Sequence, residues 1–349
     1  MSGTLSVIAP GIHTTVQDLG RVGYQAMGVP VAGALDPVAL RLVNVLVDNE
    51  PATAALEFLY QGPTLEVNTR SVRVAAAWAD IEVLGEPARR IPPWQSIRLT
   101  QGTRFRLGAP QGSVCGYLAI QGGLALASVL GSLSTYTRGR IGGLEGRALG
   151  AQDALPLAQP TAETRPEVRL SAPPNAGPPE RIRVVLGPQD ADFTAVAVAT
   201  FLAASFIVSK DADRMGLRLD GPELSHARGY NIVSDGIATG AIQVPGSGHP
   251  IIMLADHQTT GGYPKIATVI SADLPAVGRL RPGDSIRFRA VSTAEAEAAR
   301  RALEADIDRR ARNVAPAAEG SELNEAALYA NNLVSGIVSA TDWPSDGLP

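Results

Sequence analysis

Cysteine is nearly absent from this sequence, and its scarcity argues against a disulfide framework and a thiol-based metal site. The 349 residues include one cysteine and four histidines. No intrachain disulfide can form, and a Cys/His metal site is not expected. Cys115 lies in the apolar run of residues 113–120, so we expect a buried small side chain rather than a nucleophile.

An excess of positive charge is also missing. Lys and Arg total 30 against 34 Asp and Glu, giving a net charge of −4 and a pI near 5.7. No nucleic acid partner is expected, because phosphate neutralisation needs clustered basic side chains. No apolar stretch approaches the roughly 20 residues that cross a bilayer, and the N-terminus lacks the pattern of a signal peptide. The sequence therefore predicts a cytoplasmic protein without a membrane partner.

The common catalytic motifs are missing as well. The sequence contains no phosphate loop of the G-x-x-x-x-G-K-[ST] type and no G-x-G-x-x-G after a strand. It also lacks the G-x-S-x-G nucleophile elbow and the H-E-x-x-H zinc motif. If the chain handles ATP, it does so without a familiar loop.

Short β-type runs separated by glycine and proline make up most of the chain. Hydrophobic residues account for 45% of it, and Gly 36 and Pro 26 supply many turns. Predicted strands include Leu5–Ala9, Val72–Ala77, Val114–Ile120, Ile251–Leu254 and Ala267–Ile270. Many short strands with turn signals favour a mainly β fold of the barrel or sandwich type with a few helices.

Three segments predict helices. The clearest spans Asp36–Val47, where Asp36 suits the cap and Pro37 the first helical position. Asp192–Leu202 and Ser292–Arg312 are the other two.

A proline-rich segment divides the chain. Thr161–Glu180 holds five prolines and predicts a connection between domains. We therefore expect a first β-barrel-like domain at 1–165, a linker at 166–180 and a second barrel domain with a terminal helix at 181–312. Residues 313–349 are expected to form a flexible or partner-docking tail.

Two polar segments hold opposite charges close together in glycine-rich sequence. Residues 14–36 contain Gln17, Asp18 and Arg21, and Asp18 and Arg21 form either a surface ion pair or part of a site for a substrate carboxylate. Residues 130–147 carry three arginines, four hydroxyl side chains and five glycines, which suit either an anion site or a solvated loop. The sequence alone leaves both choices open.

Two further polar segments lie in the second half. Asp256–Lys265 follows an apolar run, and Gly261 and Gly262 let backbone N–H groups approach a ligand closely. A decorated turn is the structural alternative, but loops after buried strands often carry function. In residues 213–221, Arg214 either forms a salt bridge with Asp213 or Asp220 or binds an anion.

The four segments together carry a family resemblance. TTVQDLGRVGYQAMGVPVAGALD, LGSLSTYTRGRIGGLEGRALGAQDAL, DRMGLRLDG and ADHQTTGGYPKIATVI occur in order along residues 14–270. They resemble the family known as KipA, allophanate hydrolase subunit 2 or the 5-oxoprolinase C subunit, which is related to the carboxyltransferase part of urea carboxylase. The resemblance implies two cyclophilin-like β-barrel domains.

The resemblance also implies a chemistry. In 5-oxoprolinase, the A, B and C subunits open 5-oxoproline to glutamate with ATP, with Mg expected and no covalently bound cofactor. We assign Asp256 as base or orienter, and Arg214 or Lys265 as the cation for a carboxylate or phosphate. Gln258, Thr259 and the Gly261 and Gly262 amides are candidates to stabilise a developing oxyanion. Tyr263 is a candidate proton donor or pocket wall. The candidates for substrate or phosphate binding in the first segment are Gln17, Asp18 and Arg21.

The resemblance leaves three functions open. The first is a hydrolase acting on a cyclic amide with a KipI-like partner (the 5-oxoprolinase B subunit, or allophanate hydrolase subunit 1), with an A subunit as a further partner. The second is a carboxyltransferase component that needs a biotin carrier elsewhere. The third is a KipA-like regulator without enzymatic activity.

Overall fold

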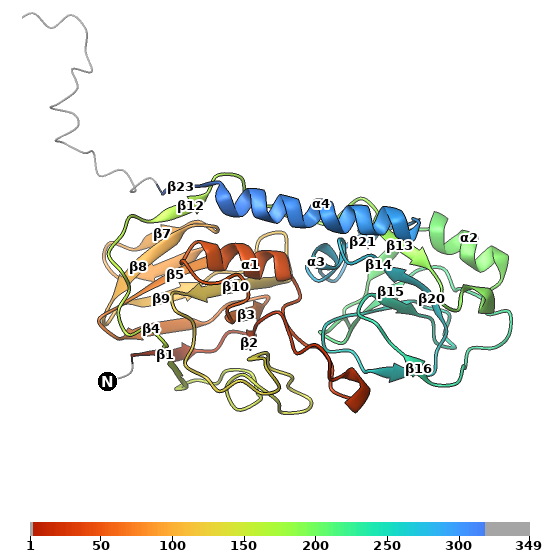
Figure 1. Cartoon of the computed structure of the whole chain (residues 1–349), viewed down its shortest axis with the longest axis horizontal. Helices are drawn as coiled ribbons and strands as arrows, with labels where there is room; N and C mark the ends of the chain where they lie inside the picture. Colours follow the sequence, from red (N-terminus) through yellow and green to blue (C-terminus); the bar gives the residue numbers. More distant parts are fainter. Residues whose placement is uncertain (1–2, 318–349) are drawn as a thin grey trace, which may run out of the picture.

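Two β-rich halves lie side by side under one long helix (Figure 1). The computed structural model describes residues 3–317. The long helix, α4 (Thr293–Arg312), runs over α1 (Pro37–Val45) of the first half and contacts β13 (Ile182–Leu186) of the second. The described part of the chain is mainly β with few helices, which confirms the predicted fold class.

The first half contains two hydrogen-bonded antiparallel sheets. The six-stranded sheet has the order β11 (Ala154–Pro156), β1 (Thr4–Ala9), β4 (Thr64–Asn68), β9 (Arg104–Leu107), β6 (Ile81–Leu84) and β7 (Arg89–Ile91). The five-stranded sheet has the order β2 (His13–Gln17), β3 (Ala55–Leu59), β10 (Cys115–Ile120), β5 (Ser71–Ala77) and β8 (Ser96–Thr100). Apolar side chains from both sheets form one core cluster between them.

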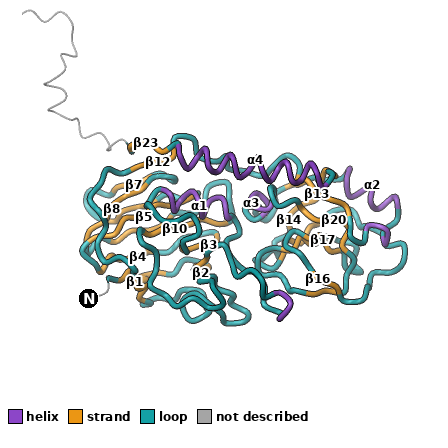
Figure 2. Tube along the Cα trace, in the orientation of Figure 1, coloured by secondary structure: helices purple, strands orange, loops and turns teal. Residues whose placement is uncertain are grey.

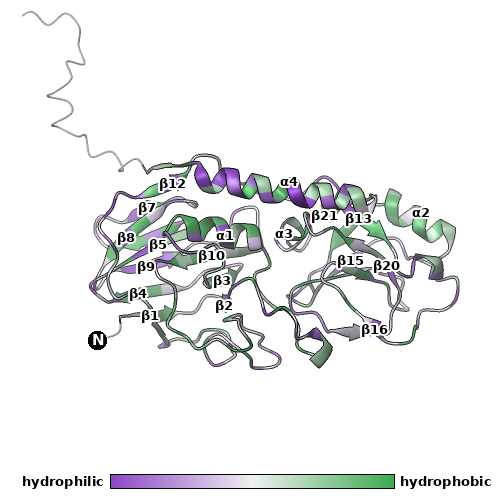
Figure 3. Ribbon diagram, viewed as in Figure 1, coloured by the Kyte–Doolittle hydropathy of each residue, from purple (hydrophilic) through white to green (hydrophobic). Residues whose placement is uncertain are grey.

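The central strand β5 shows why the sheet needs a covering helix. All seven of its residues are buried, although alternate residues of a strand point to opposite faces. One face contributes Val72 and Val74 to the core between the sheets. The other carries Ala75 and Ala77, which join a second apolar cluster with residues of α1. Figure 3 shows α1 as mostly hydrophobic, as this position requires.

The second half is a nearly closed barrel. Its eight-stranded sheet has the order β21 (Ser285–Ile286), β14 (Phe206–Val208), β15 (Gly216–Asp220), β18 (Ile251–Met253), β17 (Ala241–Gln243), β20 (Lys265–Val269), β13 and β22 (Phe288–Ala290). The two edge strands, β21 and β22, follow each other directly in the chain, so the first and last strands lie together. A small ladder of β16 (Asp235–Gly236) and β19 (Thr260–Gly261) lies beside this sheet.

The predicted helices form where their caps suggested. The Asp36 side chain accepts hydrogen bonds from the backbone N–H groups of Val38 and Ala39 at 3.1 and 3.0 Å, which caps α1. Ser292 and Glu295 form a capping box at the start of α4. The second predicted helix begins later than expected, as α2 (Ala195–Ala203), and a short α3 (Leu274–Val277) was not predicted.

The predicted linker and tail meet in a small sheet. Val168–Leu170 forms β12, which pairs antiparallel with β23 (Val314–Pro316) after α4 returns the chain to the first half. The start of the predicted linker is therefore ordered strand, and the chain just past residue 313 is not free. Local composition could not reveal this, because the pairing joins segments about 146 residues apart. The rest of the predicted tail, 318–349, lies outside the described residues.

Residues 3–317 lack two features that would suggest a membrane or a metal. No helix there is long and apolar enough to cross a membrane. No group of three or more His, Cys, Asp or Glu side chains in that range could hold a metal ion.

Candidate functional site

Arg214 lies buried between the two halves and holds two carboxylates, one from strand β3 and one from the turn that follows β18. Its Nε and Nη2 donate to the two oxygens of Asp256 at 2.9 Å each. Nη1 binds Glu57 of β3, and Nη2 also donates to the carbonyl oxygen of Gly33 at 2.7 Å. Burial alone would lower the pKa of Arg214, but Glu57 and Asp256 together raise it above its usual range. Arg214 is thus a clamp between the halves, and neither predicted partner, Asp213 or Asp220, binds it.

The clamp continues through the first half. Glu57 accepts hydrogen bonds from the Tyr117 hydroxyl at 2.6 Å and from the Leu35 amide at 2.8 Å. Asp36 accepts from the Trp78 indole at 3.1 Å and pairs with Arg279 of the second half at 2.9 Å. Neighbouring Cys115 is buried, as predicted, and burial raises the pKa of its thiol well above the usual range.

His257 follows Asp256 and is fully buried. Its Nδ1 lies 2.6 Å from the Gln258 carbonyl oxygen, which can only accept, so Nδ1 carries the proton. Nε2 then accepts from the Thr239 hydroxyl at 3.1 Å. Burial lowers the pKa of His257 below its ordinary value of 6.5, so the ring is neutral near pH 7.

This buried imidazole predicts a pH dependence of stability. Because the pKa is lowered on folding, the unfolded chain binds a proton more readily, and folding is favoured most above pH 6.5. We expect the free energy of unfolding to fall as the pH drops below 6.5 towards the lower folded pKa. Urea unfolding measured across this pH range should show that the free energy of unfolding depends less on pH in His257→Gln than in the unchanged protein. An equal slope in both proteins would contradict the assignment.

Lys265 anchors a second polar cluster at one end of the barrel. Its ammonium group is buried and donates to Asp235 at 2.8 Å and to the Gly236 carbonyl at 3.3 Å. The hydrogen bond from Lys265 lowers the pKa of Asp235. Gln189 holds both residues, because its oxygen accepts from the Lys265 amide at 3.1 Å and its nitrogen donates to Asp235 at 3.2 Å.

The other predicted residues of this segment surround Gln243. Gln243 is buried on β17, and its side chain lies 3.4 Å from both the Gln258 amide and the Tyr263 carbonyl. A Cβ on Gly261 would lie 2.7 Å from Gln243 Nε2, so glycine is needed for this approach. Thr259 and Gly262 are half-buried, and the Tyr263 side chain is 40% exposed.

Residues 14–36 and the loop of residues 130–147 come together and are joined by hydrogen bonds. Asp18 accepts from the Ser132 and Ser134 hydroxyls at 2.6 Å each and from the Leu133 amide at 2.6 Å. Gln17 donates to the Thr135 carbonyl oxygen at 3.1 Å. Asp18 therefore fixes the loop of residues 130–147, part of the long irregular stretch between β10 and β11 (Figure 2). The predicted Asp18–Arg21 surface pair is not formed, because these donors occupy the Asp18 carboxylate.

Arg21 lies between this loop and the second half. It is buried, and its Nη2 donates to the Ser134 carbonyl oxygen. Burial lowers its pKa, while nearby Asp18 and Asp256 oppose that shift. The Ala32 amide also donates to the Ala255 carbonyl at 3.0 Å, so residues 14–36 contact the chain immediately before Asp256.

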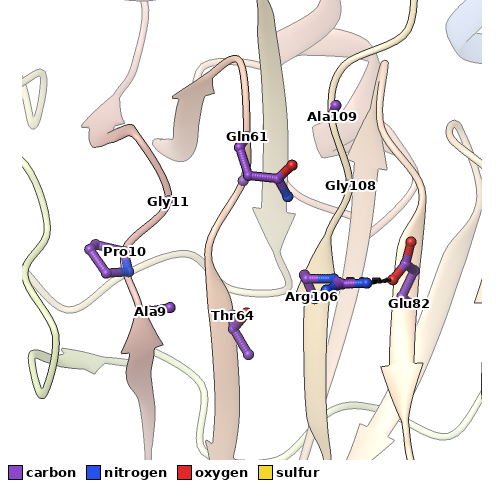
Figure 4. Close-up of a pocket in the computed structure, with 10 residues that line it drawn as sticks. Ala9, Pro10, Gly11, Gln61, Thr64, Glu82, Arg106, Gly108 and Ala109 are labelled. Carbon is purple, nitrogen blue, oxygen red and sulfur yellow. Dashed lines mark hydrogen bonds and ion pairs between the residues drawn. The ribbon is translucent and has the colours of Figure 1, made fainter.

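A surface cavity lies away from these residues. It has a volume of about 520 Å³ and is lined by ends of strands in the first half, including Gln61, Thr64 and the Arg106–Glu82 ion pair (Figure 4). A smaller cavity of about 90 Å³ touches Arg214 and is otherwise lined mainly by apolar side chains such as Leu35 and Leu254. None of the other predicted site residues lines either cavity.

The predicted residues thus form three linked groups rather than one pocket: the Arg214–Asp256 clamp, the Lys265 cluster, and the Gln17–Arg21 segment with its loop. Sequence reasoning missed Glu57, Tyr117, Gln189, Asp235 and Gln243. A polar residue inside an otherwise apolar strand was the available signal for Glu57 and Gln243, since such a side chain needs a buried partner.

This arrangement of a two-sheet half, a barrel and a polar seam belongs to a known class. The chain is a member of the carboxyltransferase domain family, subdomains A and B, which it matches over residues 27–290. It is 36% identical over 300 residues to the 5-oxoprolinase C subunit of Escherichia coli K12, covering 85% of this chain and 94% of that protein. The resemblance predicted from the four motifs is confirmed.

Larger proteins contain the same unit. Urea amidolyase of Saccharomyces cerevisiae is 31% identical over 303 residues, which cover 81% of this chain and 16% of that protein. The crystal structure of K. lactis urea amidolyase superposes with a TM-score of 0.81 at 30% identity, over 88% of this chain and 20% of that chain. The chain thus spans a small part of the urea amidolyases and nearly all of the E. coli 5-oxoprolinase C subunit.

Proposed function

We propose that this chain is the C subunit of a cytoplasmic, ATP-dependent 5-oxoprolinase that opens 5-oxoproline to L-glutamate together with a B subunit and an A subunit. One observation carries the proposal: the chain is 36% identical to a 5-oxoprolinase C subunit along 94% of that subunit, against 31% identity to urea amidolyase of Saccharomyces cerevisiae.

The Lys265 cluster best suits the lactam chemistry. Opening a lactam needs stabilisation of the charge that develops on its oxygen, which prepositioned donors provide. We assign this role to Lys265, Gln258, Thr259 and the Gly261 and Gly262 amides of one segment. The Lys265 ammonium group also binds Asp235 and Gly236, and the Tyr263 side chain is 40% exposed. Asp256 orients this segment rather than acting as a base, because Arg214 binds both of its oxygens.

ATP fits this chain poorly. The sequence has no phosphate loop, and residues 3–317 offer no three-residue acidic or histidine cluster for a metal ion. We therefore assign ATP and its Mg²⁺ to a partner protein of the assembly, and no step on this chain runs through them.

Reconstitution tests the proposal. The chain, co-expressed with B and A subunits from the same genome, is expected to release L-glutamate from 5-oxoproline only when ATP is present and all three subunits are assembled. Complexes lacking this chain are the control. Absence of glutamate from every combination would overturn the proposal.

The likeness to urea amidolyase supports a carboxyltransferase as the second candidate. That function requires a biotin carrier, so the complex should then consume carboxybiotin in the presence of urea and leave 5-oxoproline unchanged. Tight binding to the B subunit without turnover of either substrate would instead indicate a regulator.

A further inference from the structure

Arg21 has a buried guanidinium group that is largely unpaired. The residue is 1% exposed, and its Nη2 donates to the Ser134 carbonyl oxygen. Its Nε and Nη1 have no hydrogen-bond partner within residues 3–317, and each has less than 1 Å² of accessible surface. These two nitrogens carry three of the five N–H donors of the guanidinium.

The other buried arginines of the described chain behave differently. Arg73 is also fully buried, and its three nitrogens contact Glu167, Gln121 and two backbone carbonyls. Arg214 binds two carboxylates and a carbonyl. Buried donors are almost always paired, because an unpaired one loses its bond to water without replacement. In the described residues Arg98, Arg165 and Arg279 each have one buried nitrogen without a hydrogen bond, and Arg21 alone among the arginines has two.

The nearby carboxylates do not provide the missing partner. Asp18 is engaged by two hydroxyls and two backbone amides, including that of Gly20 at 2.8 Å. Asp256 is engaged by Arg214. Both lie close enough to act on the pKa of Arg21, yet neither forms an ion pair with it. Gln17 also has a buried oxygen without a partner, but that oxygen is an acceptor and cannot bind a carboxylate.

The covering loop explains why the site is closed. A Cβ on Gly142 would lie 2.6 Å from Arg21 Nη2, so the loop of residues 130–147 rests directly on the guanidinium. Gly142 and Gly143 both have positive φ, at +70° and +55°. A ligand can reach Nε and Nη1 only if this loop moves. The loop is held by hydrogen bonds to Asp18, to Gln17 and to the Val16 carbonyl oxygen.

We propose that Arg21 is the receptor for a small carboxylate, which its planar N–H donors recognise when the loop opens. This inference rests on the proposed function for the identity of the ligand, the α-carboxylate of 5-oxoproline. A carboxylate suits the site because its oxygens only accept hydrogen bonds and carry the charge opposite to that of the guanidinium.

Two probes isolate the carboxylate: 5-oxoproline, and 2-pyrrolidinone, which is the same lactam without it. Calorimetry on the assembled complex without ATP is expected to show 5-oxoproline binding at least about 10-fold more tightly, as one hydrogen bond between charged groups provides. In Arg21→Met this preference is expected to disappear while 2-pyrrolidinone binding stays unchanged, which also shows that the variant folds. Arg21→Lys should retain part of the preference, and Arg104→Met, at an exposed ion pair, all of it.

The outcomes separate this inference from the proposed function. A preference that survives in Arg21→Met, or no binding of 5-oxoproline at millimolar concentration, overturns the carboxylate site. If the assembled complex releases glutamate but its preference for 5-oxoproline over 2-pyrrolidinone does not depend on Arg21, only the carboxylate site is rejected and the proposed function stands. An Arg21-dependent preference without ATP-driven glutamate release supports the site and rejects the proposed function.

Discussion

Replacing Arg214 with methionine is expected to lower the free energy of unfolding by about 3–5 kcal/mol. The substitution leaves the carboxylates of Glu57 and Asp256 without their common cation, and the side chains are 1% and 7% exposed. Uncompensated buried charge is costly because water cannot replace the lost partner. The two halves should also lose their main polar connection, so the unfolding transition should broaden or separate into two steps.

Urea unfolding followed by tryptophan fluorescence measures this effect, since Trp78 lies in the same seam. Adding Glu57→Gln and Asp256→Asn to Arg214→Met removes the stranded charges and should recover much of the loss. Arg104→Met serves as the matched control, because its pair with Glu66 is 59% exposed on the arginine side and should contribute at most about 1 kcal/mol. Equal losses in Arg214→Met and Arg104→Met would show that the seam is no clamp.

Locally encoded features were predictable from the sequence. The prediction of the first helix needed only Asp36 and Pro37 at its start. The prediction of the last helix needed Ser292 and a long run of helix-forming residues. Each of these signals acts within four residues of the backbone that it stabilises. The mainly β class followed similarly from turn spacing, whereas the closure of the barrel by β21 and β22 depends on sheet order, which local patterns do not contain.

Partner choice was where sequence reasoning failed. Arg214 has acidic residues one and six positions away in the chain, yet it binds Glu57 and Asp256, 157 and 42 positions away. Asp213 instead pairs with Arg138. An Asp18–Arg21 ion pair was one of the two alternatives for that segment, but the loop of residues 130–147 provides the donors that bind Asp18. In a folded chain, a charged side chain can pair with residues far away in the sequence as well as with its near neighbours. Burial favours the arrangement in which the backbone groups around the pair also form hydrogen bonds.

The chemistry of Lys265 gives the second large effect. The sequence has two lysines, Lys210 and Lys265, among its 30 Lys and Arg residues. A lysine at this buried position is therefore unusual for a chain whose basic residues are nearly all arginine. A compact ammonium group fits beside Asp235 and Gly236, and a planar guanidinium would need more space. If it stabilises charge on the opening lactam, Lys265→Met should lower the kcat of the reconstituted enzyme by about 100- to 1,000-fold.

The same variant should fold normally, which separates catalysis from stability. Asp235, the partner left behind, has a side chain that is 53% exposed, so water solvates its carboxylate and the stability should change by at most about 1 kcal/mol. The pKa of Asp235 should rise towards its ordinary range once the Lys265 hydrogen bond is lost, which NMR titration of the carboxyl group detects. Lys210→Met is the control, because Lys210 is exposed. A normal kcat for Lys265→Met with the expected shift at Asp235 would show that the ammonium group holds strand β16 and takes no part in the reaction.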